Sequence, residues 1–198
     1  LAAYSQLRAM ADGGSPWNQI LITAMKGLGG NYSPALAALY GLRDAAMRQS
    51  GENPQDRNLT AEVAELNSRL GEDNRTVALL DSMAVDDPRR QSLALISYNA
   101  LVDSRRYTDA MVGKSFGSML NEFQNEVGSA EKQSGLSQAS VRNFAVTNAL
   151  RDIEVLTGAS KLDEARLLTE KLLSFDDSDA TRARVKQHVD RASQSTTP

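Results

Sequence analysis

The chain has 198 residues, of which 41% are hydrophobic, a fraction sufficient to form a buried core. Its net charge is −3 and no stripe of Lys and Arg stands out that would face a phosphate backbone, so we expect no nucleic-acid partner. It contains no cysteine, which excludes disulfides, thiol catalysis and thiolate metal ligands.

Signals that start and stop helices recur along the chain. Ser33-Pro34 places a Ser at an N-cap and a Pro at the first helical position, and Asp87-Pro88 repeats the arrangement with Asp. Glycines such as Gly71 fit the ends between these starts. Apolar residues between the marks recur every three or four positions, and the alternation typical of strands is absent. We therefore predict an all-α protein with helices over residues 1–11, 15–28, 33–50, 57–70, 73–86, 88–104, 107–128, 138–157, 160–175 and 178–193.

Most of the predicted linkers are short, which favours antiparallel neighbours. The exception is segment 128–137, which is polar and rich in Gly, Ser, Gln, Glu and Lys. We interpret it as a loop or as a frayed extension of a helix.

Residues 161–177 carry a pattern with a defined spacing. Leu162 lies three residues before the small residue Ala165, and the helix closes with Phe175, Asp176 and Asp177. This segment resembles the second helix of a tetratricopeptide repeat, with Asp in place of the family's closing Pro.

The same spacing, which we call the repeat frame, recurs elsewhere in the chain. Tyr32 lies three positions before the small residue Ala35, as Tyr107 does before Ala110, and Asp73 precedes Thr76 by the same spacing. Thr76 and Ala110 are 34 residues apart, which is the repeat length of that family. The family's Trp-x-x-Leu-Gly-x-x-Tyr signature is absent from the first helices of the pairs. We expect the small residues Ala110 and Ala165 to be buried where the two helices of a pair cross.

The resemblance implies a single helical-repeat domain over residues 1–198, an α-α superhelix of antiparallel helix pairs similar to a tetratricopeptide solenoid. The expected helix pairs are residues 15–50, 57–86, 88–128 and 138–175. The expected flanking helices are residues 1–11 and 178–193.

No group of residues predicts catalysis. His188 is the only histidine and has no Cys or carboxylate cluster with which to bind zinc, so we interpret it as a solvated helix residue. The paired acids Asp86-Asp87 and Asp176-Asp177 fall at helix ends, where capping explains them. We expect a protein that is not an enzyme and binds no metal and no cofactor.

The resemblance implies a function in binding a protein or peptide partner on a concave face lined by the first helix of each pair. The identity of the partner is open. The frame predicts that the following residues line this groove: Asn58, Glu62, Glu65, Arg69, Asn99, Asp103, Thr147, Arg151 and Glu154.

The alternative is a structural spacer or accessory domain of a larger envelope protein or enzyme. The chain starts at Leu1, so we expect either a removed leader or a piece of a longer protein, and this favours an extracytoplasmic location, in the periplasm or envelope, over the cytoplasm. The longest apolar runs, such as 34–39, are too short to span a bilayer, so we predict no transmembrane segment.

Overall fold

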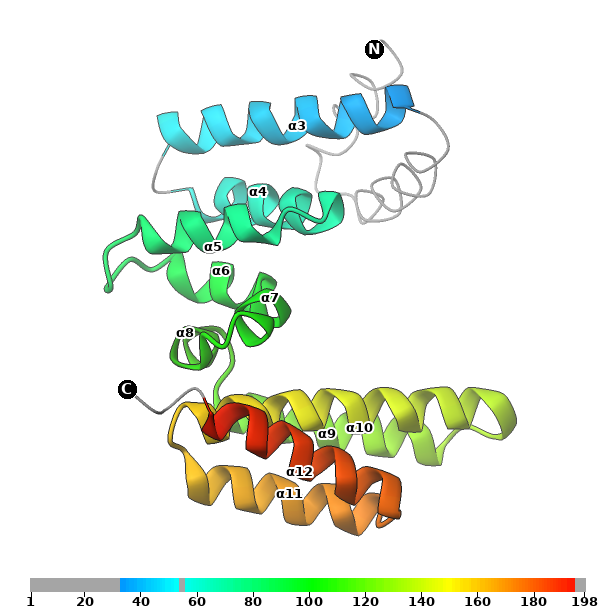
Figure 1. The fold of residues 1–198 in the computed structure, drawn as a ribbon. Coiled ribbons are helices and arrows are strands. Elements are labelled where there is room, and N and C mark those ends of the chain that lie inside the picture. The colour runs from blue at the N-terminus through cyan, green and yellow to red at the C-terminus, as the bar shows by residue number, and fades with distance from the viewer. Residues whose placement is uncertain (1–32, 54–55, 195–198) are drawn as a thin grey trace. The chain divides into compact units, whose positions relative to one another are not determined.

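The computed structural model describes residues 33–53 and 56–194, and this part of the chain is helical and contains no strand (Figure 1). The all-α prediction is therefore confirmed for the described residues. The predicted helices at 1–11 and 15–28 lie outside them. The helices are α3 (Ser33–Glu52), α4 (Arg57–Leu70), α5 (Asp73–Asp81), α6 (Arg90–Ile96), α7 (Tyr98–Asp103), α8 (Tyr107–Gly113), α9 (Phe116–Glu131), α10 (Gly135–Gly158), α11 (Leu162–Phe175) and α12 (Asp179–Ser193).

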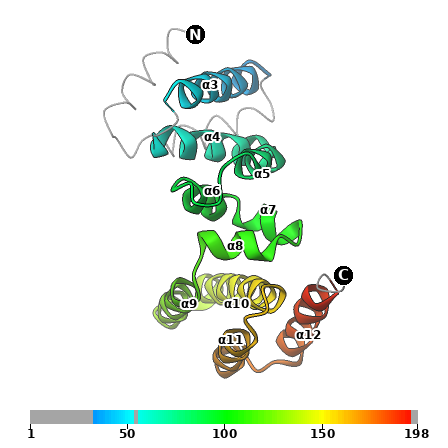
Figure 2. The same cartoon turned by 90° about the vertical axis from the view of Figure 1, so that its left-hand side faces the viewer.

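The chain divides into two compact units, Leu1–Ala84 and Val85–Pro198, called unit 1 and unit 2 below. The described helices of unit 1 are α3, α4 and α5. Unit 2 holds α6 to α12. Figure 2 shows the same helices turned by 90°.

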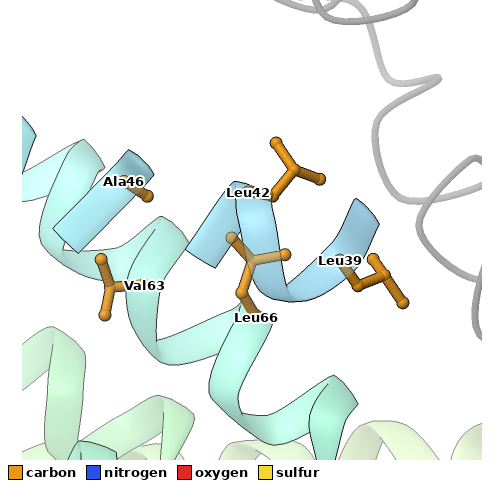
Figure 3. Packing of buried hydrophobic residues seen from close by; sticks show 5 residues of the cluster. All are labelled: Leu39, Leu42, Ala46, Val63 and Leu66. Atoms are coloured by element: carbon orange, nitrogen blue, oxygen red, sulfur yellow. The ribbon is translucent and has the colours of Figure 1, made fainter. Parts of the chain in front are cut away.

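The core of the described part of unit 1 lies between α3 and α4. Leu39, Leu42 and Ala46 recur at helical spacing on α3 and pack with Val63 and Leu66 of α4 (Figure 3). All five side chains are buried. Burying a Leu or Val side chain contributes about 1.5–3 kcal/mol, so this shared face holds the two helices together.

A buried polar contact joins α4 to α5. The Nδ2 group of Asn67 donates a hydrogen bond of 3.1 Å to Oγ1 of Thr76, and both residues are buried. Thr76 is the small residue of the predicted repeat frame. Its hydroxyl gives the buried amide group a partner that Ala at this position would lack.

Three turns between successive helices share one backbone geometry: α4–α5, α7–α8 and α10–α11. In each, one residue has a positive φ, and the N–H of the next residue bonds to the carbonyl five positions earlier, as in a Schellman motif. The left-handed residues are Gly71 at φ 73°, Arg105 at φ 59° and Ser160 at φ 61°. The closing bonds run from Glu72 to Asn67 (2.8 Å), from Arg106 to Leu101 (2.7 Å) and from Lys161 to Leu156 (2.7 Å).

Each of these turns stands at the same place in the predicted frame. The small residue follows the left-handed residue by five positions in all three cases, and it is buried: Thr76, Ala110 and Ala165. The burial expected for Ala110 and Ala165 is confirmed. Arg105 follows Gly71 by 34 residues.

Helix α10 is the central helix of unit 2. It packs against α7, α8, α9, α11 and α12, and residues 152–157 are buried without interruption. Helices α9 and α10 form a long antiparallel hairpin (Figure 1). Helix α10 is covered by neighbouring helices on several sides, so some of its polar residues are buried inside unit 2.

Helices α6 and α8 approach closely at Gly113. A Cβ atom added to Gly113 would lie 2.3 Å from the backbone nitrogen of Leu95 and 2.5 Å from the carbonyl carbon of Ala94. Only glycine fits there without a backbone shift.

Two predicted helices are each interrupted. Predicted helix 88–104 is α6 and α7, with a break at Ser97, whose hydroxyl donates to the Leu93 carbonyl at 2.7 Å and competes with the helical hydrogen bond. Predicted helix 107–128 is α8 and α9, separated by extended backbone at Lys114 and Ser115. Ser115 caps α9 by accepting from the Ser118 N–H.

Other helix ends also differ from the prediction. Predicted helix 73–86 ends at Asp81, where the Ser82 hydroxyl bonds to the Leu79 carbonyl. The polar segment 128–137 is mostly helical, because α9 runs to Glu131 and α10 begins at Gly135. The segment is therefore mostly an extension of the two flanking helices, with residues 132–134 as the loop between them.

Candidate functional site

Unit 2 holds an open polar pocket of about 200 Å³, called the Lys114 pocket. Its walls come from α6, α7, α9 and α10, together with the residue that follows α8. The lining residues are Leu95, Tyr98, Asn99, Lys114, Glu122, Asn148, Arg151 and Asp152.

The end of α8 aims Lys114 into this pocket. Helix α8 stops at Gly113, which is pressed against the backbone of α6, and Lys114 then adopts an extended conformation at φ −137° and ψ 107°. The side chain is buried as a result. The break that the sequence did not predict is therefore what places a cation inside the unit.

A buried ion pair lies at the base of the pocket. The Lys114 ammonium lies 3.0 Å from Oδ1 and 2.9 Å from Oδ2 of Asp152, and 2.8 Å from Oε2 of Glu122. The hydroxyl of Tyr98 donates a hydrogen bond of 2.6 Å to Oδ1 of Asp152. Asp152 thus has donors on both carboxylate oxygens, which is what a buried carboxylate requires.

The surroundings of Lys114 and Tyr98 keep both groups protonated at neutral pH. Burial on its own would lower the pKa of Lys114, but the charge of Asp152 and the bonds to Glu122 and Asp152 outweigh it and raise that pKa. Burial and the Asp152 carboxylate raise the pKa of Tyr98. Lys114 is a fixed cation and Tyr98 a hydrogen-bond donor.

The mouth of the pocket is formed by residues that reach across from α7 to α10. The Nη1 group of Arg151 donates to Oδ1 of Asn99 at 2.6 Å, and its Nη2 lies 3.8 Å from Oδ1 of Asp103. On the other side, Nδ2 of Asn148 donates to Oε1 of Glu126 at 2.7 Å. Burial raises the pKa of Glu126 above its usual value.

One predicted groove residue, Arg151, thus contacts two others. Asn99, Asp103 and Arg151 form one network, and Asn99 and Arg151 also line the Lys114 pocket. Thr147 lies elsewhere on α10, where its hydroxyl accepts a bond of 3.0 Å from Nη2 of Arg184 on α12.

The other predicted groove residues do not belong to this network. Asn58, Glu62, Glu65 and Arg69 lie on α4 in unit 1, with Asn58 exposed and the other three half-buried.

The prediction that Glu154 faces a groove is wrong, because its side chain is fully buried. Its Oε1 accepts a bond of 2.9 Å from the Tyr107 hydroxyl and lies 3.3 Å from Nε of Arg191. Its Oε2 lies 2.5 Å from Nδ1 of His188. His188 is only partly solvated, as its side chain is 23% exposed and its imidazole joins α12 to α10 through Glu154.

The residues at the base of the pocket were not found by sequence reasoning. A partial signal was present, because Asp152 and Glu154 lie among the apolar residues Leu150, Ile153 and Val155 of α10, next to Arg151. Acidic residues in a buried helix need cationic or hydroxyl partners. Nothing in the sequence indicated that Lys114 would supply one of them.

In the described part of the chain, no group of three or more His, Asp or Glu side chains is placed to hold a metal ion. The described helices include none that is both long and apolar enough to cross a membrane. No known protein family, no curated protein and no solved structure matches this chain.

Proposed function

We propose that this protein is a non-enzymatic binding module of tetratricopeptide-like architecture, and that the Lys114 pocket of unit 2 contacts a polypeptide partner. One observation carries the proposal. Asn99 and Arg151 were predicted as groove residues from the repeat frame, and they lie in contact on the wall of an open polar pocket.

The protonation of Lys114 and Tyr98 argues against either as a catalytic base or nucleophile. A general base or a nucleophile must be deprotonated, or easily deprotonated, near neutral pH, so a raised pKa makes an ammonium or hydroxyl group less suited to either role. The pKa values of Lys114 and Tyr98 are both raised, so neither group is suited to this role. Histidine, the usual base near neutral pH, is engaged with Glu154 outside the pocket lining.

The lining residues suit recognition of a peptide. Since Oδ1 of Asn99 accepts from Arg151 and Nδ2 of Asn148 donates to Glu126, polar side chains of a bound segment would meet the Nδ2 group of Asn99 and the Oδ1 atom of Asn148. Arg151 and Glu122 supply the two signs of charge at the mouth. Polar side chains arranged in this way fix the orientation of a bound segment.

The proposal is tested by selecting binders from a displayed random-peptide library with the intact protein and mapping them by NMR. We expect selected peptides to shift the amide signals of Asn99, Arg151 and their neighbours. Replacing Arg151→Glu should weaken binding about tenfold or more, as expected for a central contact. The matched control is Arg166→Glu, on an exposed position of α11.

Selected peptides that map away from the pocket, or that keep their affinity for the Arg151→Glu protein, would contradict the proposal. Failure to select any peptide at the pocket would also contradict it and would favour the structural spacer. Circular dichroism of both variants checks that the fold is retained.

A further inference from the structure

Two large apolar side chains are exposed beside the Lys114 pocket. Leu95 lines the pocket and is 51% exposed, and Phe144 on α10 is 58% exposed. Phe144, Asn148 and Arg151 are spaced by four and three residues, so they share one face of α10. They span about 10 Å along the helix axis at 1.5 Å per residue.

The charge presented outward around the pocket is acidic. Glu122 and Asp103 have side chains that are 51% and 59% exposed. The two cations are less accessible, at 9% for Lys114 and 32% for Arg151, and both are paired with carboxylates. A segment approaching this surface therefore meets exposed carboxylates before it meets an ammonium or guanidinium group.

The backbone around the pocket offers no site for strand addition. Apart from Lys114, the residues lining the pocket lie on α6, α7, α9 and α10, whose backbone groups are used within the helices. An extended peptide would leave its own N–H and C=O groups without backbone partners along this surface. A helix satisfies its backbone internally and needs only side-chain contacts.

We propose that the segment bound at the Lys114 pocket is a basic amphipathic helix. Its apolar side chains pack on Phe144 and Leu95, and a Lys or Arg from the same face points toward Glu122. This inference rests on the proposed function and deepens it by naming the chemical class of the partner.

The test uses three synthetic helical peptides of eighteen residues as probes, measured by fluorescence anisotropy at physiological salt. The first combines Leu and Lys in an amphipathic pattern, the second replaces Lys by Glu, and the third replaces Leu by Ser. We expect the Leu/Lys peptide to bind at least about tenfold more tightly than either of the others, because it alone offers both the apolar face and the complementary charge.

Matched variants of the protein locate the binding. Phe144→Ser and Glu122→Gln should each weaken the Leu/Lys peptide several-fold, whereas Leu162→Ser and Glu170→Gln should not. Leu162 and Glu170 lie on α11 and are exposed, so they control for the loss of an exposed apolar group and of an acidic charge. The melting temperature of each variant checks its fold.

Equal losses in the control variants, or equal binding of the Leu/Glu peptide, would overturn the inference. If none of these helices binds while library peptides still map to Asn99 and Arg151, the proposed function stands and the basic helix is wrong. If no peptide of any kind maps to the pocket, both fail together.

Discussion

The Lys114 ammonium lies 2.9 Å from Oδ2 of Asp152 and ties the residue after α8 to α10 across 38 residues of sequence. Both side chains are almost completely buried. A buried pair of this kind contributes little beyond an apolar pair of the same shape, but removing one partner leaves an uncompensated charge. The pair therefore makes the pocket sensitive to single substitutions.

Replacing Lys114→Met should lower the free energy of unfolding by about 3–5 kcal/mol, because Asp152 would keep only Tyr98 as a donor. Urea unfolding followed by circular dichroism measures this change. Lys132→Met is the control, since Lys132 is exposed at the end of α9. A loss below about 1 kcal/mol would contradict the prediction and show that no uncompensated charge remains on Asp152.

Gly113→Ala should destabilise the protein by about 1–3 kcal/mol. The new methyl group would overlap backbone atoms of α6, which cannot move aside by a side-chain rotation. Gly128→Ala is the opposite case. Gly128 lies within α9 and nothing stands within 4 Å of its added Cβ, so alanine should stabilise by about 0.5–1 kcal/mol. Thermal unfolding of the two variants compares them, and similar shifts would contradict the close approach of α6 and α8.

Asp87 should contribute stability that depends on pH. Hydrogen bonds from the side chain and backbone of Arg89 lower the pKa of Asp87 from 3.8 to about 2. Since the pKa is lower in the folded state, the contribution is present above pH 3.8 and is lost as the pH falls toward about 2.

The Asp87→Asn variant should therefore lose less stability than the parent across that window. Unfolding midpoints in urea between pH 6 and pH 2 measure the difference. Asp86→Asn is the neighbouring control, because Asp86 is exposed. Parallel pH curves for the parent and Asp87→Asn would contradict the prediction.

Glu154→Gln should loosen α12 in particular. The buried side chains of α12 are only Thr181 and Ala192, so its attachment to α10 depends heavily on polar contacts, among them those of His188 and Arg191 with Glu154. We expect the amide protons of α12 to exchange at least about tenfold faster in this variant. Hydrogen exchange read by mass spectrometry measures it, with the exposed Glu170→Gln on α11 as control. Unchanged protection of α12 would show that its apolar contacts suffice.

The sequence predicted the helices well where the signals are local. The predicted helix 57–70 has the observed bounds of α4, where Asp56 caps the start and Gly71 closes the end. The breaks at Ser97 and Lys114 were missed because the helical periodicity of apolar residues continues across them. One of these breaks is stabilised by tertiary contacts, since Lys114 leaves the helix to meet Asp152.

Part of the candidate site followed from spacing, and part did not. Asn99 and Arg151 were found because the repeat frame put them on the first helices of successive pairs, and they are in contact. The same frame misplaced Glu154, because spacing along one helix does not reveal which sides its neighbours cover. Helix α12, which supplies His188 and Arg191, covers that side of α10.

The shared geometry of the three turns bears on how the chain folds. Each turn around Gly71, Arg105 and Ser160 is closed by hydrogen bonds that reach back only three to five residues. Closing such short loops costs little chain entropy, and proteins dominated by local contacts fold fast. Each of these three turns can therefore form early in folding, before the contacts between residues distant in sequence are made.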